Sequence, residues 1–217
     1  MRARLAWVEW ATIDYACRHW HYARQVPAGR LMGLGVWEGE RFVGVIVFGR
    51  GATPSIGKPY GLEQGQICEL VRVALRDHET PVSRMLAVAL RLLKRRCPGL
   101  RLVISYAASE EGHYGGIYQA GGWLYEGPMD SYKIEIHGRL VHARSVGSRY
   151  GRHHIAFLRE MIDPNARAVR GLIRHKYLMP LDEEMRALAK AKARPYPKQT
   201  ELRAKQAMAG APGTAAV

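Results

Sequence analysis

The chain has 217 residues, 47% of them hydrophobic, and carries 33 Lys and Arg residues against 19 Asp and Glu, a formal net charge of +14. This length suits one domain with a real core, and no stretch approaches the roughly 18 consecutive apolar residues of a membrane span. The first residues lack a signal-peptide core, so we expect a soluble cytoplasmic protein. Cys17, Cys68 and Cys97 are odd in number and far apart, which favours reduced thiols over a disulfide framework or a Cys-x-x-Cys zinc site.

The positive charge is concentrated toward the C-terminus. Half of the surplus falls in the last 66 residues, which makes this third about twice as basic per residue as the rest. A surplus of this size indicates a polyanionic partner, and nucleic acid is the commonest one inside cells. Plain solubility is the alternative that the composition leaves open.

The first half of the chain predicts three strands, a helix and a fourth strand. Residues 31–50 form two β-rich runs around a short Gly-containing turn and predict a hairpin, and residues 66–75 predict a third strand. Residues 81–96 predict a helix, with Pro81 in the first turn and basic residues at the C-terminal end of the dipole. Residues 101–107 predict the fourth strand.

The second half continues the mixed pattern. A short helix is expected around the sequence IYQAGGW, and residues 131–146 predict a second hairpin that turns at His137 and Gly138. Residues 154–162, 166–178 and 182–193 predict helices. The order of elements, β-β-β-α-β-α-β-β followed by helices, predicts an α/β domain with strands of mixed direction.

Two short segments combine unusual residue types. The stretch from Glu110 to Gly127 contains six glycines, three tyrosines, a tryptophan and a histidine. Glycine costs roughly 0.5–1 kcal/mol inside a helix, whereas aromatic side chains mark a core, a stacking platform or a site. The second segment, HWHYAR at residues 19–24, can supply base stacking, a general base or a metal ligand. A structural helix end is the alternative for it.

The strand ELVRVAL, the helix from Pro81, the strand LVISYA and the sequence IYQAGGW resemble in this order the acyl-CoA core of the GNAT N-acetyltransferase superfamily. In that superfamily the turn before the helix wraps a pyrophosphate, since backbone N–H groups at a helix N-terminus form an anion site. The usual Arg/Gln-x-x-Gly-x-Gly/Ala loop is replaced here by RDHETPVSRM. The resemblance implies acetyl-CoA contacts at Val71, Val73, Arg76, Pro81, Val82, Ser83, Arg84 and Tyr118. Tyr118 is either the general acid that protonates a departing thiolate or a core residue.

The closer resemblance is to the phage Mom family of DNA-modification proteins, from about Cys17 to Lys198. It is carried by CRHWHYARQVPAGRLMGLGVWE, FVGVIVFGRGA, ELVRVALRDHETPVSRML, ISYAASEEGHYGGIYQAGGWLYEG and KYLMPLD. It implies conversion of adenine in double-stranded DNA to an N6-methylcarbamoyl-type derivative that shields phage DNA from host restriction. It also implies acetyl-CoA as the acyl source, an associated iron(II) ion, and action in the cytoplasm of an infected or lysogenic bacterium.

The resemblance and the two aromatic segments together predict a site. A base inside a duplex must be flipped out, at a cost of a few kcal/mol that stacking partly recovers. We expect His113, Tyr114, Tyr118 and Trp123 to line the pocket. The predicted catalytic residues are His21, Tyr22, Ser109, His113 and Tyr118, and the predicted metal ligands are His21 and Tyr22. The predicted DNA contacts are Trp20, Arg24, Tyr114, Arg149, Arg152, Arg170, Arg174 and Lys176.

One position departs from the family pattern. The resemblance implies an acidic residue at position 108, where this chain has Ala108. A carboxylate there would bind a metal or take a proton from the base amine. Either Glu110, Glu111 or Asp130 takes this role, or the chain is an altered, inactive form.

Two other functions stay open. An ordinary N-acetyltransferase would show an acidic acceptor groove and no dependence on DNA. A non-catalytic DNA-binding protein that kept the fold would bind DNA without affinity for CoA. For the architecture we expect a GNAT-like α/β domain with a mixed, mostly antiparallel sheet over residues 1–148, a basic helical extension over 149–199 and a disordered tail over 200–217.

Overall fold

A computed structural model describes residues 3–51 and 53–197, so the predicted tail over 200–217 lies outside the described residues. The strands are β1 (Ala3–Val8), β2 (Leu31–Glu38), β3 (Arg41–Gly49), β4 (Ile67–Leu75), β5 (Leu102–Ala108), β6 (Leu124–Ile136), β7 (Arg139–His142) and β8 (Arg167–Pro180). The α-helices are α1 (Trp10–Trp20), α2 (Val82–Arg96), α3 (Gly116–Ala120), α4 (Ala143–Tyr150), α5 (Ile155–Met161) and α6 (Glu183–Lys192). Within these described ranges, no helix has the length and apolar character that crossing a bilayer requires.

The eight strands form one sheet in the order β1-β2-β3-β4-β5-β8-β6-β7. Every neighbouring pair is antiparallel except β4 and β5, which run parallel and are connected through α2. The predicted GNAT-like fold class, a mixed and mostly antiparallel sheet with flanking helices, is therefore confirmed.

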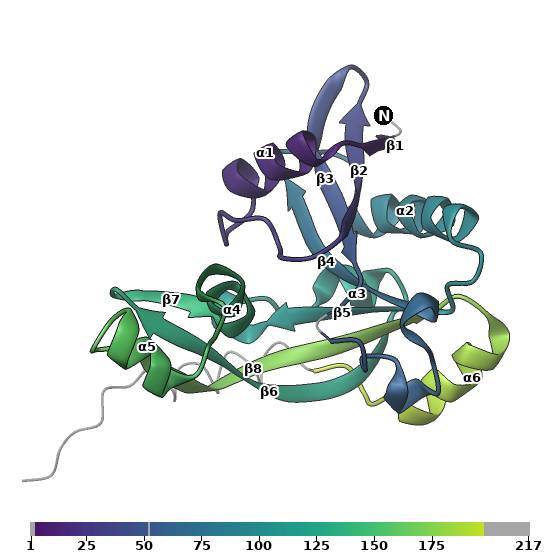
Figure 1. The fold of residues 1–217 in the computed structure, drawn as a ribbon. Helices are drawn as coiled ribbons and strands as arrows, with labels where there is room; N and C mark the ends of the chain where they lie inside the picture. The colour runs from purple at the N-terminus through teal and green to yellow at the C-terminus, as the bar shows by residue number, and fades with distance from the viewer. Residues whose placement is uncertain (1–2, 52, 198–217) are drawn as a thin grey trace, which may run out of the picture.

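A bulge in β4 separates the sheet into two halves. The pairing of β3 with β4 passes from Val47 opposite Arg72 to Phe48 opposite Leu70, which leaves Val71 as an extra residue. Pairing of β4 with β5 ends at Leu70. Because a bulge bends its strand and increases the local twist, the strands diverge beyond this point. Figure 1 shows β1–β4 and the half that contains β5, β6 and β8 running in clearly different directions.

Helices cover both faces of the first half of the sheet. Residues of β3 alternate between the faces, as a strand requires, so Val45 and Val47 pack with α1 while Ile46 and Phe48 belong to the core beneath α2. The apolar residues of α2 recur at helical spacing and are buried: Met85, Leu86, Ala89, Leu90 and Leu93. Figure 1 shows α1 and α2 on opposite sides of β1–β4.

The prediction of a helix over residues 166–178 is wrong. These residues form most of β8, which lies between β5 and β6 and pairs with both. Sequence periodicity could not show this, because the strand is defined by partners on both edges that come from distant parts of the chain. His175 and Tyr177 are buried as alternate residues of the strand. The basic region over 149–199 is therefore partly strand and not a helical extension alone.

Other boundaries differ less. The second hairpin turns at His137, as predicted, but its second strand ends at His142, and the next four residues begin α4. The first strand and first helix of the fold, β1 and α1, were not predicted. The remaining predicted strands and helices are present within a few residues of their expected bounds.

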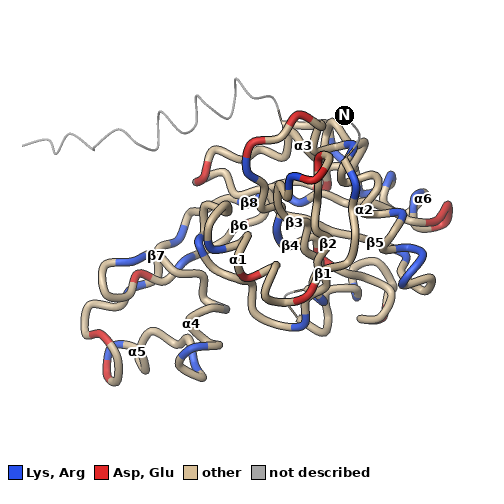
Figure 2. Tube along the Cα trace, turned by 90° about the horizontal axis from the view of Figure 1, so that it is seen from above, with Lys and Arg blue, Asp and Glu red and all other residues tan. Residues whose placement is uncertain are grey.

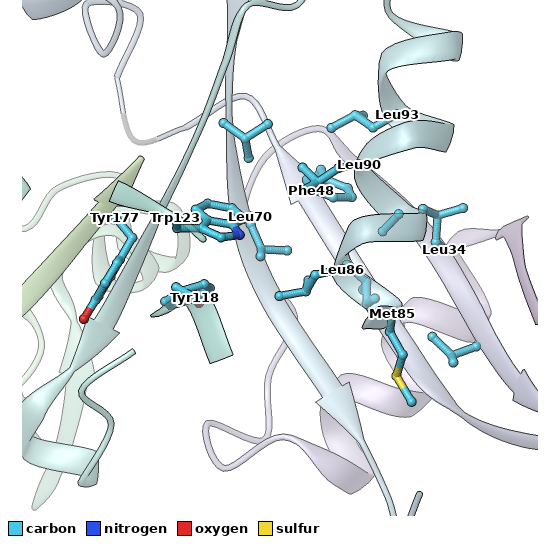
Figure 3. Close-up of a cluster of buried hydrophobic side chains, with 14 of the residues drawn as sticks. Leu34, Phe48, Leu70, Met85, Leu86, Leu90, Leu93, Tyr118, Trp123 and Tyr177 are labelled. Atoms are coloured by element: carbon cyan, nitrogen blue, oxygen red, sulfur yellow. The ribbon is translucent and has the colours of Figure 1, made fainter. Parts of the chain in front are cut away.

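The glycines of the stretch from Glu110 to Gly127 let aromatic rings pack against the backbone. Trp123 is 0% exposed, and its ring centroid lies 5.1 Å from that of Tyr118. The Tyr118 ring centroid in turn lies 5.1 Å from that of Tyr177, and Leu70 belongs to the same cluster (Figure 3). Gly115 has a φ of +81°, and a Cβ placed on it would come within 2.2 Å of Cε2 of Tyr177. The expectation that Trp123 lines a pocket is wrong, because it is a core residue.

Gly115→Ala should destabilise the protein by about 2 kcal/mol or more. A Cβ in the left-handed region costs roughly 1–2 kcal/mol, and the Tyr177 ring would also have to move. Gly116→Ala is the matched control, since nothing lies within 4 Å of its Cβ position and alanine favours a helix. Urea unfolding measures both variants, and equal free energies of unfolding would contradict the packing described.

Candidate active site

A pocket of about 300 Å³ opens where β4 and β5 separate. Its floor contains Glu69 and Arg72 from β4, Ala108 from the end of β5 and Arg174 from β8. One wall is the segment after α1, which includes Tyr22. The opposite wall is formed by residues of β6, β7 and α4, so the pocket lies between the two halves of the sheet.

The bulge in β4 brings two charged side chains into this pocket. Glu69 and Arg72 are three residues apart and would face opposite sides of a regular strand. The extra residue Val71 reverses the alternation, and both side chains line the pocket. Glu69 is only 7% exposed. Sequence reasoning missed both residues, although charges within the apolar run ELVRVAL were a signal.

Guanidinium groups dominate the electrostatics of the floor. Burial lowers the pKa of Arg72, which also feels the nearby charges of Glu69 and Arg174. Within the described part of the chain, Nε of Arg72 and Nε of Arg174 are buried without a hydrogen-bond partner. Lys133 and Glu111 form an ion pair of 3.0 Å at the edge of the pocket. These buried N–H donors can bind an acceptor or anion on a ligand.

The two aromatic segments meet at the pocket. The Tyr22 ring centroid lies 4.1 Å from that of His21 and 5.3 Å from that of His113. A tight turn brings His113 close to the end of β5. In this turn Gly112 has a φ of +71°, and the His113 N–H donates to the Ala108 carbonyl at 3.1 Å. The structure thus brings together three of the five predicted catalytic residues.

His21 is a neutral hydrogen-bond donor in this arrangement. Its Nδ1 accepts the N–H of Ala23 at 3.0 Å, which leaves the proton of the neutral ring on Nε2. Burial, with the positive charges of Arg72 and His113, lowers the pKa of His21 to about 3. Because neither ring nitrogen is free to accept a proton at neutral pH, His21 is better suited to donating to a ligand than to acting as a base.

The low pKa of His21 makes stability depend on pH. Below about pH 6.5 the unfolded chain binds a proton at His21, whereas the folded protein binds it only near pH 3, so stability falls as the pH drops through this window. His21→Gln should weaken this dependence, with His175, whose pKa burial also lowers, supplying a remaining part. Melting temperatures of the wild type and of His21→Gln at pH 7, 5.5 and 4 test this. The same fall in melting temperature with pH in both proteins would contradict it.

Tyr118 lies in the core directly below the point of separation. It is 7% exposed, and Oγ of Ser105 lies within hydrogen-bonding distance, 2.8 Å, of both the Tyr118 hydroxyl and the Leu70 carbonyl oxygen. Burial raises the pKa of Tyr118 to about 12, so the phenol keeps its proton at neutral pH. Tyr118 is not part of the pocket lining. The role of Tyr118 as general acid stays a prediction.

Several predicted residues are held by contacts within the fold. Ser109 Oγ donates to the Ile173 carbonyl at 2.7 Å. The guanidinium of Arg24 donates to backbone carbonyls at the end of α1. Lys176 forms an ion pair of 2.9 Å with Glu126, and its side chain is only 11% exposed. These three side chains therefore stabilise their surroundings.

The predicted aromatic DNA contacts lie outside the pocket lining. The Trp20 ring packs against Phe42, with the Arg76 guanidinium 5.5 Å from its centroid. Tyr114 is half-buried, with its ring against His175. Neither ring is presented as a free stacking surface.

Basic residues are spread over the fold. Figure 2 shows Lys and Arg positions on many elements, with Asp and Glu positions between them. Arg149, Arg152 and Arg170 are exposed, whereas Arg174 is half-buried in the pocket. The three exposed arginines are free to contact a partner such as a phosphate backbone.

The residues predicted to contact acetyl-CoA follow β4 to the start of α2. Val71 lines the pocket and Val73 is half-buried on the core side. Pro81 immediately precedes α2, and Val82 and Ser83 form its first turn. Arg84 is exposed and lines a separate cavity of about 500 Å³ between β1 and α2. The predicted cofactor residues therefore do not share one pocket.

The donor set for a metal is incomplete. Across the two described ranges, no group of three or more His, Cys, Asp or Glu side chains is placed to hold a metal ion. At the predicted ligands His21 and Tyr22, Nδ1 of the histidine is already bound to Ala23. An iron(II) site of the kind formed by two histidines and a carboxylate does not fit these residues.

The replacements considered for an acid at position 108 lie in different places. Ala108 lines the pocket, and so does Glu111, which is paired with Lys133. Asp130 is exposed on β6 and is not part of the lining. The Glu110 side chain lies outside the described structure. The buried carboxylate of the pocket is that of Glu69.

A sheet in which two parallel strands separate beyond a bulge in one of them, with a pocket at the division, defines a GNAT-like α/β domain. A profile of the Mom protein family matches residues 2–198, and the chain belongs to this family. The resemblance seen in the sequence is thereby confirmed.

Two individual proteins illustrate the similarity. The methylcarbamoylase mom of Escherichia phage Mu is 27% identical over 186 residues, which cover 82% of this chain and 76% of that protein. A crystal structure of a Bacillus subtilis acetyltransferase in complex with CoA has a TM-score of 0.45 and 12% identity, and it covers 83% of this chain and 100% of that one.

Proposed function

We propose that this protein is a phage DNA-modification enzyme that converts adenine to an N6-methylcarbamoyl-type derivative, with acetyl-CoA as the acyl source. Membership of the Mom family supports the reaction class. The observation that carries the proposal is the pocket at the β4 bulge, where a buried carboxylate, two guanidinium groups and the Tyr22 ring, itself in contact with His21 and His113, come together.

The aromatic wall suits a flipped base. Tyr22 is 50% exposed, and its ring is in contact with those of His21 and His113. An exposed ring held in place by its neighbours offers a stacking surface at little cost in side-chain entropy. The Nε2–H group of His21 can donate a hydrogen bond to a ring nitrogen of adenine.

Glu69 is the group in this pocket suited to the exocyclic amine. A carboxylate accepts hydrogen bonds from an N–H2 group and takes a proton from it as the nitrogen bonds to an acyl carbon. When bound, acetyl-CoA would supply the activated acyl carbon and release CoA as its thiol. The nitrogen that distinguishes a methylcarbamoyl-type group from an acetyl group would come from a second, nitrogen-donating co-substrate. The guanidinium groups of Arg72 and Arg174, which line the pocket, can donate to a carbonyl oxygen or a phosphate of the bound substrates.

The duplex around the base needs phosphate contacts. Arg149, Arg152 and Arg170 are exposed, and the first two belong to the part of the chain around α4 that borders the pocket. Such contacts orient DNA without reading its sequence and make affinity fall with salt. Arg149→Ala should therefore weaken binding to different duplexes to a similar extent.

Purified protein, acetyl-CoA, a short duplex and a bacterial extract that supplies the nitrogen donor provide the test. Digestion of the duplex to nucleosides and mass spectrometry should show a heavier deoxyadenosine species. A duplex built without adenine on either strand is the negative control, since it offers the protein no target. Acetylation of free amines without any change in DNA would instead favour an ordinary N-acetyltransferase, and DNA binding without acetyl-CoA binding would favour a non-catalytic DNA-binding protein.

A further inference from the structure

In the turn between β4 and α2, a carboxylate side chain of the protein already accepts the backbone N–H groups. The carboxylate of Glu38, the last residue of β2, accepts the backbone N–H of Glu79 at 3.0 and 3.1 Å and that of Thr80 at 2.7 Å. Arg41 donates to the same carboxylate at 3.1 Å. Glu38 is 5% exposed, so these bonds are formed away from solvent.

This contact uses the donors that an anion would seek in this turn. Backbone N–H groups before a helix bind negative charge because they lack partners within the helix and lie at the positive end of its dipole. Two of them point at Glu38, and Pro81 has no N–H to offer. The hydrogen bonds from Thr80 and Glu79 lower the pKa of Glu38 to about 2, so the carboxylate keeps its charge at neutral pH.

We propose that Glu38 is the resident anion of this turn and that the diphosphate of an acyl-CoA binds without the N–H groups of Glu79 and Thr80. This inference rests on the proposed function for its choice of cofactor. A diphosphate placed on the turn would have to displace Glu38 or lie against its charge, and both are unfavourable because like charges repel. The rest of the cofactor would then carry most of the affinity.

The direct test follows the two amides by NMR during a titration with inorganic pyrophosphate. In the wild-type protein the amide signals of Glu79 and Thr80 should not move. In Glu38→Gln, which removes the charge and keeps the shape, both should shift as pyrophosphate binds. Glu40→Gln removes an exposed charge from the same hairpin turn and should behave like the wild type. The amide spectrum itself shows whether each variant is folded.

Pyrophosphate-dependent shifts of both amides in the wild-type protein would overturn the inference. So would a Glu38→Gln variant that is folded and whose amides do not respond. Calorimetry adds a second readout, because Glu38→Gln should bind acetyl-CoA about tenfold tighter than the wild type and bind S-acetylpantetheine, which lacks the diphosphate, equally well. If neither protein binds acetyl-CoA while the amides behave as expected, acetyl-CoA is rejected as the cofactor and the assignment of Glu38 stands.

Discussion

Glu69→Gln should lower the yield of modified adenine by about 100-fold or more, because a positioned general base contributes roughly 10² to 10⁴ to a rate. Glutamine fills the same space but cannot take a proton from the adenine amine. Glu69 is 7% exposed on the floor of the pocket, and the β4 bulge directs it there together with Arg72. The yield is measured by mass spectrometry of nucleosides, with DNA affinity and the free energy of unfolding measured in parallel.

Glu160→Gln is the matched control for this variant. Glu160 is exposed on α5, so the same change of charge occurs away from the pocket and should leave the yield unchanged. A Glu69→Gln protein that modifies DNA as well as the wild type would remove Glu69 from the reaction. A protein with reduced yield and equally reduced DNA affinity would assign Glu69 to binding of the base.

Trp123→Ala should destabilise the protein by about 3–5 kcal/mol, the usual cost of truncating a large buried aromatic side chain. Trp123 is 0% exposed and packs against Tyr118 in the core between the sheet and α2 (Figure 3). Its Nε1 has no hydrogen-bond partner among the described residues, so the loss comes from packing and the cavity alone. Urea unfolding measures the change.

Trp10→Ala provides the comparison, since Trp10 is 61% exposed at the start of α1. A surface substitution of this kind changes stability by about 0.5 kcal/mol or less. Similar unfolding midpoints for the two variants would mean that Trp123 is not part of the main core.

Local patterns were sufficient for the elements with strong periodicity. The apolar spacing of α2 and the β-rich runs of β2, β3 and β4 are visible within short windows of sequence. The strand β8 was predicted as a helix because its residues interleave Arg with apolar side chains, and only pairing with β5 and β6 defines it. Long-range pairing of this kind leaves no local signal.

The site was predictable by residue type and not by arrangement. His21, Tyr22 and His113 attracted attention as members of aromatic segments, but their meeting depends on how α1 and the loop after β5 pack. The positions of Glu69 and Arg72 depend on a register shift opposite β3. No spacing rule within β4 reveals that shift, because it arises between two strands.

The proposed activity of this pocket is the modification of adenine in DNA. The most direct measurement is mass spectrometry of nucleosides from plasmid recovered from bacteria that express the chain. We expect a heavier deoxyadenosine species that is absent without the protein and lost in Glu69→Gln. Only the four ordinary deoxynucleosides, recovered from cells that contain the folded wild-type protein, would contradict it.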